Sequence, residues 1–209
     1  MSERGRLITI EGVDGAGKTT LAAGLLEALA RSGVRARPLR EPGGVPTSEA
    51  VRALVKDARL TVGARAEALL YAAARAQLVE EALDPALSAG EWVLLDRFVD
   101  SSLAYQGGGR ALGIEQVREL NLFATGGLTP DRTLLLALDP ASAQARADAR
   151  GQAADRLELA GAEFFARIAD AYRQLAEAEP QRIRVLDATL PAEQVVAQAL
   201  DALEDLLPG

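Results

Sequence analysis

The sequence LITIEGVDGAGKTT, residues 7–20, decides the fold. Residues 7–10 are apolar or β-branched and predict a buried strand, while GVDGAGKT, residues 12–19, matches the phosphate-loop (P-loop) pattern G-x-x-x-x-G-K-[ST]. The apolar-periodic segment 21–33 predicts a helix that ends at its glycine. This order points backbone N–H groups and a helix N-terminus at an anion. The stretch therefore predicts a phosphate site in an α/β domain.

Lys18 and Lys56 are the only lysines among the 23 basic residues of the chain. An ammonium group is a compact charge that bridges β- and γ-phosphate oxygens in a narrow loop, where a planar guanidinium fits poorly. The alternative, a glycine-rich turn with an exposed lysine, does not account for the strand-to-helix context. We therefore predict that ATP is bound by Gly12, Val13, Asp14, Gly15, Ala16, Gly17, Lys18 and Thr19.

Thr19 and Asp96 are the residues that we predict to hold Mg²⁺. Thr19 supplies the hydroxyl of the phosphate loop, and Asp96 closes the apolar strand 92–96 and holds the ion directly or through water. Asp139 also closes an apolar segment, where capping of the next segment is a common structural role. Arg97 favours Asp96, because a cation beside this carboxylate indicates a second phosphate and hence a phosphorylated acceptor.

Composition limits the remaining chemistry. The 209 residues are 49% hydrophobic without an apolar run of about 18 residues, which predicts one soluble domain, residues 1–209, and no membrane contact. The N-terminal residues lack the pattern of a secretory signal, so we expect a cytoplasmic protein. Cysteine and histidine are absent, which excludes thiolate catalysis and the commonest general base. A net charge of −7 argues against nucleic acid as a partner.

Strand-like and helix-like segments alternate along the chain. Strands are predicted at 7–10, 34–39, 92–96, 133–139 and 183–186. Helices are predicted from 48, at 64–83, 114–123, 141–149 and 162–176, and from 192, with a glycine-rich loop at 107–109. The fold class expected is α/β, a five-stranded parallel sheet flanked by helices on both faces.

Known classes of phosphate-loop protein can be separated by what accompanies the loop. A GTPase needs an Asn-Lys-x-Asp element, and the sole asparagine, Asn121, is not followed by lysine. A motor or remodelling ATPase has a larger module with sensor elements that we do not find. A small-molecule kinase remains, and about 200 residues is an ordinary size for one.

Over nearly its whole length the chain resembles the thymidylate kinase family. The shared motifs, in order, are IEGVDGAGKTT (10–20), REPGG (40–44), LLYAAARAQL (69–78), the Asp-Arg pair with DSSLAYQGGGR (100–110), LDPA (138–141), ARGQAADRLE (149–158) and LDAT (186–189). The resemblance implies a P-loop nucleoside monophosphate kinase fold with a short lid. It also implies a Mg²⁺-dependent homodimer that converts dTMP and ATP to dTDP and ADP in dTTP biosynthesis, with residues 187–189 near adenine.

The resemblance also assigns the acceptor site, with dTMP bound by Asp14, Tyr71, Arg75, Arg97, Ser101, Ser102, Tyr105 and Gln106. It implies that Arg97 grips the acceptor phosphate and that Tyr71, in place of the family's usual Phe, stacks on thymine beside Arg75. Helix spacing alone predicts a core residue at 71 and a solvated one at 75. The resemblance further implies that Tyr105 packs where a ribose 2′-hydroxyl would lie and so selects the deoxy sugar by exclusion.

Catalytic arginines are expected in a lid, about residues 146–160. One arrangement of the family carries an arginine after the acidic residue of the phosphate loop, and the other, bacterial arrangement has glycine there and lid arginines. Gly15 indicates the second. Negative charge spreads over the oxygens of the transferring phosphoryl group, so lid arginines are expected to stabilise that charge. Arg150 and Arg156 are the preferred candidates, and Arg146 ranks third. The predicted catalytic residues are Asp14, Lys18, Arg97, Arg150 and Arg156.

Two alternatives remain open at this stage. One is a related kinase that phosphorylates another pyrimidine nucleotide. The other is a nucleotide-binding switch that gates a protein partner, although a switch gives no reason for the Tyr71/Arg75 and Asp96-Arg97 pairs.

Overall fold

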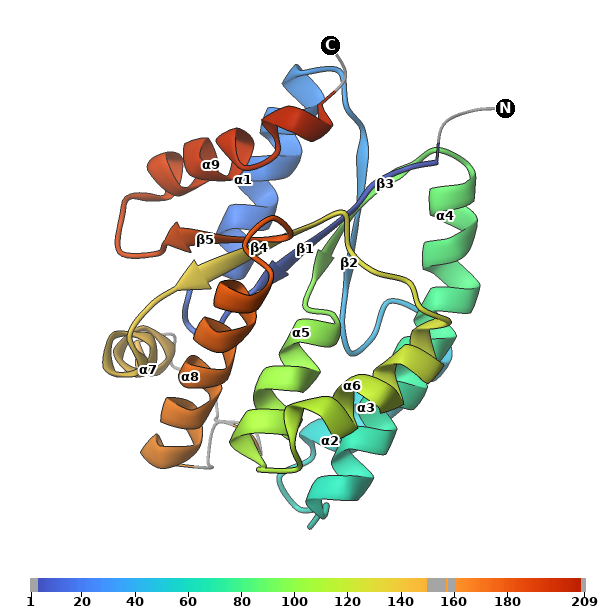
Figure 1. Ribbon diagram of the computed structural model, residues 1–209, viewed down its shortest axis with the longest axis vertical. Helices are drawn as coiled ribbons and strands as arrows, with labels where there is room; N and C mark the ends of the chain where they lie inside the picture. The colour runs from blue at the N-terminus through green and yellow to red at the C-terminus, as the bar shows by residue number, and fades with distance from the viewer. Residues whose placement is uncertain (1–3, 150–156, 158–160, 208–209) are drawn as a thin grey trace.

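The computed structural model describes residues 4–149, 157 and 161–207. It contains one parallel five-stranded sheet in the order β2-β3-β1-β4-β5, which confirms the predicted fold class (Figure 1). The strands are β1 (Leu7–Glu11), β2 (Ala36–Arg40), β3 (Trp92–Asp96), β4 (Arg132–Ala137) and β5 (Ile183–Asp187).

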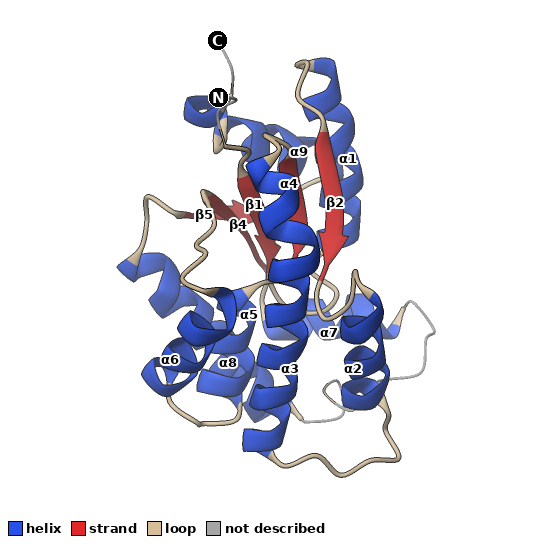
Figure 2. Cartoon of the chain, turned by 90° about the vertical axis from the view of Figure 1, so that its right-hand side faces the viewer, coloured by secondary structure: helices blue, strands red, loops and turns tan. Residues whose placement is uncertain are grey.

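Helices cover the sheet on both sides (Figures 1 and 2). The α-helices are α1 (Lys18–Arg31), α2 (Pro46–Lys56), α3 (Ala64–Leu78), α4 (Asp84–Ser88), α5 (Val99–Ser102), α6 (Ile114–Thr125), α7 (Pro140–Asp148), α8 (Ala162–Ala178) and α9 (Ala192–Asp201). The other helical segments are the π-helices η1 (Val79–Leu83) and η2 (Leu103–Gly109) and the 3₁₀-helix η4 (Glu204–Leu206).

The central strands are buried on both faces because their alternate side chains serve two cores. Leu94 of β3 joins the larger core with Leu25 of α1, whereas Val93 and Leu95 join the second core with Leu87 of α4. This double burial explains why the strands appear in the sequence as continuous apolar runs.

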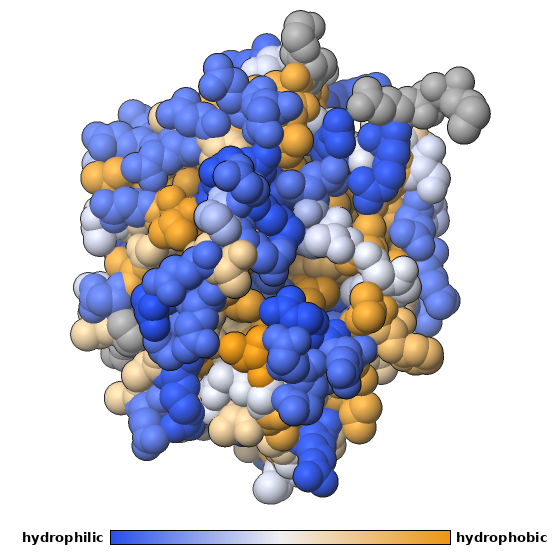
Figure 3. Space-filling model, viewed as in Figure 1, coloured by the Kyte–Doolittle hydropathy of each residue, from blue (hydrophilic) through white to orange (hydrophobic). Residues whose placement is uncertain are grey.

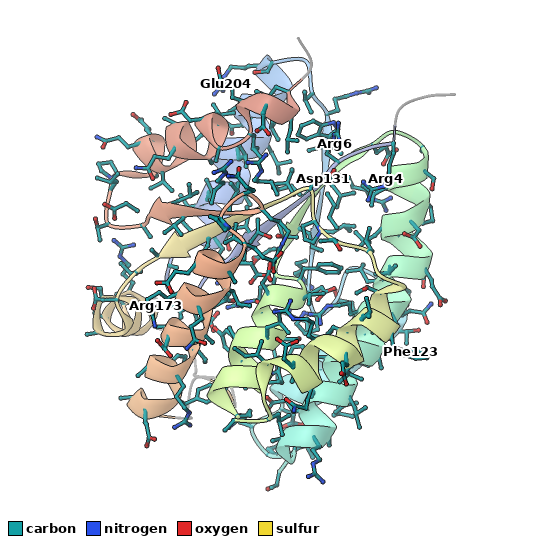
Figure 4. All side chains as sticks on the ribbon, viewed as in Figure 1. Arg4, Arg6, Phe123, Asp131, Arg173 and Glu204 are labelled. Carbon is teal, nitrogen blue, oxygen red and sulfur yellow. The ribbon has the colours of Figure 1, made fainter. Side chains whose placement is uncertain are left out.

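The register of the sheet fixes where the functional side chains lie. Ile10 of β1 pairs with Asp96 of β3, and Asp96 also pairs with Arg40 of β2. Parallel strands end at the same edge, so the phosphate loop after β1, the turn after β3 and the loop after β2 meet there. At the opposite end, Asp131 accepts hydrogen bonds from Arg4, Arg6 and the Leu7 N–H, which anchors the start of β1 to that of β4 (Figure 4).

Three local predictions differ from the structure. The predicted loop 107–109 lies within η2, which continues the helix α5 and packs against α8. Gly109 permits this packing, since an added Cβ would lie 2.6 Å from Cε2 of Phe164. Helical structure continues from α3 through η1 and α4 to Ser88, because the wider π-turn comes just before Pro85, which lacks an N–H.

The third difference concerns Asp139, which lies beyond β4 rather than within it. The strand ends at Ala137, where pairing with β5 stops at Asp187. Asp139 Oδ1 instead accepts the Ser142 N–H over 2.9 Å at the start of α7. This is the capping role that a carboxylate has at a helix N-terminus.

On the face seen in Figure 3, hydrophobic residues form separate groups among hydrophilic ones. Within the described ranges, no helix is long and apolar enough to cross a membrane.

Candidate active site

A cavity of about 680 Å³ opens at the carboxyl edge of the sheet, where the three loops meet. Its size is typical of small-molecule sites. The described residues that line it are Asp14, Gly15, Gly17, Lys18, Thr19, Thr20, Arg40, Glu41, Pro42, Arg52, Lys56, Tyr71, Asp96, Arg97, Ser101, Ser102, Tyr105, Gln106, Arg146 and Leu157. Most of the predicted ATP, dTMP and metal residues thus share one cavity.

The cavity lining is basic although the chain carries a net charge of −7. Its cations are Lys18, Arg40, Arg52, Lys56, Arg97 and Arg146, and its carboxylates are Asp14, Glu41 and Asp96. An excess of cations in a concave site attracts polyanions such as nucleotides.

The phosphate loop wraps around Lys18, the first residue of α1. Gly12 and Gly17 have φ values of 136° and 100°, a left-handed region that favours glycine, and a Cβ on Gly12 would lie 2.8 Å from the Leu136 carbonyl oxygen. Lys18 Nζ donates to the carbonyl oxygens of Gly12 and Val13 at 3.1 and 3.0 Å. Gly12 and Val13 line a separate, largely apolar pocket rather than this cavity.

The Lys18 ammonium is nearly buried, with 8% of its surface exposed. Burial and the nearby Arg97 charge lower its pKa to about 8, although Asp14 and Asp96 oppose the shift. A bound phosphate would add negative charge beside the ammonium and favour its charged form.

Asp14 joins the phosphate loop to the turn after β3. Its Oδ1 accepts a hydrogen bond from Arg97 Nη2 at 2.9 Å and lies 3.9 Å from Lys18 Nζ, while its Oδ2 accepts from the Tyr105 hydroxyl at 3.3 Å. Burial alone would raise the pKa of Asp14, but Arg97 and Lys18 together hold it below its usual range. The carboxylate therefore stays ionised between two cations.

Arg97 occupies a left-handed backbone conformation, with φ of 70°. This conformation is uncommon for a residue other than glycine and marks a constrained turn. Its guanidinium donates to Ser101 Oγ at 3.0 Å and to the Tyr105 hydroxyl at 3.2 Å, and it lies 5.0 Å from the centre of the Tyr105 ring. The turn thus aims a preorganised guanidinium at the cavity beside Asp14.

Glu11 is a residue that sequence analysis gave no role. It is fully buried at the end of β1, where it accepts hydrogen bonds from the Phe98 N–H, the Ser101 hydroxyl and the Tyr172 hydroxyl at 2.7, 2.5 and 2.9 Å. Burial and the neighbouring Asp100 raise the pKa of Glu11 to about 7. The sequence signal was available, because a charged residue ends an otherwise apolar strand.

Arg75 is buried rather than solvated, with 1% of its surface exposed. All five of its N–H donors are used, by Glu41 Oε2, the Ser102 hydroxyl, Asn121 Oδ1 and the Phe98 carbonyl oxygen. Arg75 lies behind the cavity wall, while Tyr71 lines the cavity. The predicted contact of Arg75 with thymine therefore requires an exchange of hydrogen-bond partners.

Glu41 was quoted within the REPGG motif but was given no role. Its Oε2 pairs with Arg75, and its buried Oε1 has no hydrogen-bond partner among the described residues. Burial raises the pKa of Glu41, although the Arg75 charge opposes the shift. An unpartnered carboxylate oxygen in the cavity wall is a ready acceptor for a ligand donor.

Gln106 is oriented by a buried carboxylate. Its Nε2 donates to Oε1 of Glu67 at 2.9 Å, and Arg110 pairs with the same carboxylate at 3.1 Å. With the amide nitrogen held in the wall, the side chain of Gln106 is fixed where it meets the cavity.

The helix α2 contributes cations to the cavity that sequence analysis missed. Arg52 and Lys56 lie four residues apart on α2 and both line the cavity, and Arg52 also donates to the Pro42 carbonyl oxygen at 2.9 Å. This i, i+4 pair is a sequence signal, because it includes one of only two lysines.

Thr19 and Asp96 fit a site for Mg²⁺. Both line the cavity, and the buried Asp96 Oδ1 has no hydrogen-bond partner in the part of the chain that the structure describes. Carboxylate and hydroxyl oxygens are the ligands that Mg²⁺ takes, with waters and substrate phosphates completing the shell. Among the described residues, no group of three or more His, Cys, Asp or Glu side chains is placed to hold a metal ion.

Of the three arginines predicted for the lid, Arg146 is the one that the described residues include. It lines the cavity from α7 and donates to the Ala188 carbonyl oxygen at 3.0 Å, in the loop predicted to lie near adenine. The predicted catalytic residues Arg150 and Arg156 lie outside the described residues.

The parallel sheet carries a phosphate loop at its carboxyl edge, in a cavity that is also lined by Arg97 and by the basic residues Arg52 and Lys56 of α2. This arrangement defines a phosphoryl-transfer enzyme that holds two phosphorylated ligands together. This is the arrangement of a nucleoside monophosphate kinase.

Comparison with known proteins identifies the family. A family model described as thymidylate kinase matches residues 10–199. The chain is 48% identical to thymidylate kinase of Deinococcus radiodurans over 97% of this chain and 98% of that protein. It is also 48% identical to thymidylate kinase of Oenococcus oeni over 99% of both chains. The chain belongs to the thymidylate kinase family and is an ATP-dependent phosphotransferase, which confirms both predictions.

Glu11 gives the free energy of unfolding a pH dependence that a Glu11→Gln variant should lack. The folded pKa of about 7 exceeds the unfolded value of 4.5, so between these values the folded state binds more protons and loses stability as pH rises. The loss is on the order of 3 kcal/mol across this window. Urea denaturation at pH 5 and pH 8 should show the variant gaining relative to wild type at pH 8. A pH-independent difference would contradict the assignment.

Proposed function

We propose that this chain transfers the γ-phosphoryl group of ATP to dTMP, giving dTDP and ADP for dTTP biosynthesis, inside the cavity at the carboxyl edge of the sheet. The contact between Asp14 and Arg97 carries the proposal, because it joins the phosphate loop for ATP to a guanidinium suited to an acceptor phosphate. The family to which the chain belongs supplies the identity of the acceptor.

The reaction needs positioning and charge stabilisation rather than a covalent intermediate. Lys18 and the loop amides hold the β- and γ-phosphates, while Arg97 holds the phosphate of dTMP beside Asp14. Before dTMP binds, the ion pair with Asp14 keeps the Arg97 guanidinium directed into the cavity. The phosphate of dTMP then competes with Asp14 for the N–H groups of Arg97.

Mg²⁺ is proposed as the cofactor, with Thr19 and Asp96 as its protein ligands. When bound, it neutralises charge on the donor phosphates. The cavity position of both residues and the unpartnered Asp96 oxygen support the assignment. We propose the cytoplasm as the compartment, since ATP and dTMP are intracellular metabolites.

Tyr71, Ser101, Ser102, Tyr105 and Gln106 are proposed to bind the nucleoside of dTMP. All five line the cavity, and Ser101 and Tyr105 accept hydrogen bonds from Arg97. Tyr105 is held by hydrogen bonds to Asp14 and Arg97, so its ring is a rigid wall of the kind that excludes a 2′-hydroxyl. Arg75 is proposed to act on the base from behind this wall.

The alternative from another class of protein is a nucleotide-binding switch. A switch would hydrolyse ATP slowly and independently of any acceptor, whereas the cavity cations Arg52, Lys56 and Arg97 favour a phosphorylated acceptor.

A panel of acceptors tests the proposed reaction. We expect the coupled ADP-release assay to give the highest kcat/KM with dTMP, lower values with dUMP, UMP, CMP and AMP, and little turnover without acceptor. Equal or better turnover of any ribonucleotide would contradict the assignment of dTMP as the acceptor. Turnover that ignores every acceptor would favour the switch.

Arg156→Ala tests the proposed lid arginine. Loss of a guanidinium that stabilises transition-state charge should lower kcat by a factor on the order of 10² to 10³ with little change in dTMP binding. Arg59→Ala is the control, because Arg59 is exposed, pairs with Asp57 and lies outside the cavity lining. Unchanged kcat in Arg156→Ala would remove Arg156 from the catalytic set, and Arg150→Ala would then be the next variant.

A homodimer is proposed on the basis of exposed apolar side chains on α3 and α6, which pack against each other. Leu69 on α3 is 58% exposed, and Leu122 and Phe123 on α6 are 63% and 90% exposed. Figure 4 shows Phe123 at the outer surface of α6. Burial of such side chains between subunits is a common source of dimer stability.

Sedimentation velocity tests the dimer. We expect a species of twice the 22.0 kDa chain mass, which Leu122→Ser should weaken because it removes apolar surface from the proposed interface. Leu60→Ser, at an exposed leucine between α2 and α3, is the matched control and should leave the dimer intact. A monomer at micromolar wild-type concentration would overturn this part of the proposal.

A further inference from the structure

The Glu11 carboxylate lies one layer behind the cavity wall, in a setting that costs free energy. It is fully buried, and the three groups that donate to it are the Phe98 N–H and the Ser101 and Tyr172 hydroxyls. Neutral donors compensate the desolvation of a carboxylate less well than a cation does. An apolar residue would fit the end of a buried strand at lower cost, so the carboxylate calls for a reason beyond packing.

Two of these three donors, the Phe98 N–H and the Ser101 hydroxyl, are linked directly to Arg97. The Phe98 N–H belongs to the next residue of the chain, and the Arg97 N–H itself donates to the Ile10 carbonyl oxygen at 3.0 Å. Adjacent groups of β1 therefore hold both peptide units of the turn in which Arg97 has its left-handed conformation.

Ser101 provides the second link, through the side chain. An ionised carboxylate only accepts hydrogen bonds, so the Ser101 hydroxyl donates its proton to Glu11 and offers its lone pairs to Arg97 Nη1 at 3.0 Å. The carboxylate thereby sets the direction of the hydrogen-bond chain that ends on the guanidinium. Tyr172 adds a tie from α8 to the same carboxylate oxygen.

We infer that Glu11 is a positioning residue, which holds the backbone turn and the guanidinium of Arg97 in the pose that receives the acceptor phosphate. The inference rests on the proposed function, in which Arg97 binds the phosphate of dTMP. Glu11 itself touches no substrate in this account; it acts through the Phe98 N–H and the Ser101 hydroxyl.

Glu11→Gln tests the inference, because the amide keeps the shape of the side chain but replaces one acceptor oxygen with a donor. At pH 8 we expect the KM for dTMP to rise about tenfold, as hydrogen-bond networks of this kind act as a unit, while the KM for ATP stays within twofold. Thymidine lacks the phosphate, so its inhibition constant should be unchanged.

A double-mutant cycle identifies the path of the effect. If Glu11 acts through Arg97, Glu11→Gln should add little to the loss of dTMP affinity in an Arg97→Ala background. Asp131→Asn is the control, because the Asp131 carboxylate pairs with Arg4 and Arg6 at 3.2 Å at the opposite end of the sheet and lies outside the cavity lining. It should lower thermal stability without raising the KM for dTMP.

Additive losses in the cycle, an equal rise in both KM values, or weaker thymidine binding would overturn the inference. Should Glu11→Gln fail to fold, Glu11→Asp keeps the charge but is too short to hold both links, and an unchanged KM for dTMP in that variant would also overturn it. Wild-type protein that does not phosphorylate dTMP would instead refute the proposed function. Wild-type turnover with an unaltered Glu11→Gln variant would refute only the role of Glu11.

Discussion

The site depends on the parallel pairing of β1 with β3. Their register sets Ile10 beside Asp96, so the phosphate loop and the Asp-Arg turn leave the sheet from adjacent strands at the same edge. The ion pair between Asp14 and Arg97 joins residues 83 positions apart in the sequence, and it exists because of that register. One donor-binding loop and one acceptor-binding turn thereby share a single cavity.

Around the paired ends of β1 and β3 the protein buries several charged side chains. Arg75, Glu67 and Glu11 are nearly or fully inaccessible to solvent and are hydrogen-bonded behind the cavity wall, while the buried Glu41 lines the cavity and pairs with Arg75. Buried polar networks are costly unless satisfied, and when satisfied they hold one conformation. Their placement behind the cavity favours a wall that is already in its binding geometry before substrate arrives, which lowers the reorganisation that catalysis requires.

The fold was accessible from the sequence to a large extent. Apolar segments predicted β1, β3, β4 and β5, a weaker pattern predicted β2, the phosphate loop predicted the first helix, and alternation of the two element types predicted the parallel sheet. The wrong predictions concern segments whose helix geometry is set by packing against other elements. The glycines at 107–109 indicate a loop locally, yet they form part of a π-helix because α8 packs closely on them. Pro85 likewise indicates an end to a helix that a π-turn allows to continue.

For the site, local spacing was enough to predict which chemical groups are present: a phosphate loop, an ammonium, a carboxylate within the loop and an Asp-Arg turn. Tertiary structure alone decided which groups face the ligand and which support them. Arg75 has the spacing of a surface residue but lies buried in a network of four partners, and Glu11 becomes a partner of Phe98, Ser101 and Tyr172 only once three distant elements meet. Burial and hydrogen-bond direction depend on contacts between elements, which no periodicity within one element encodes.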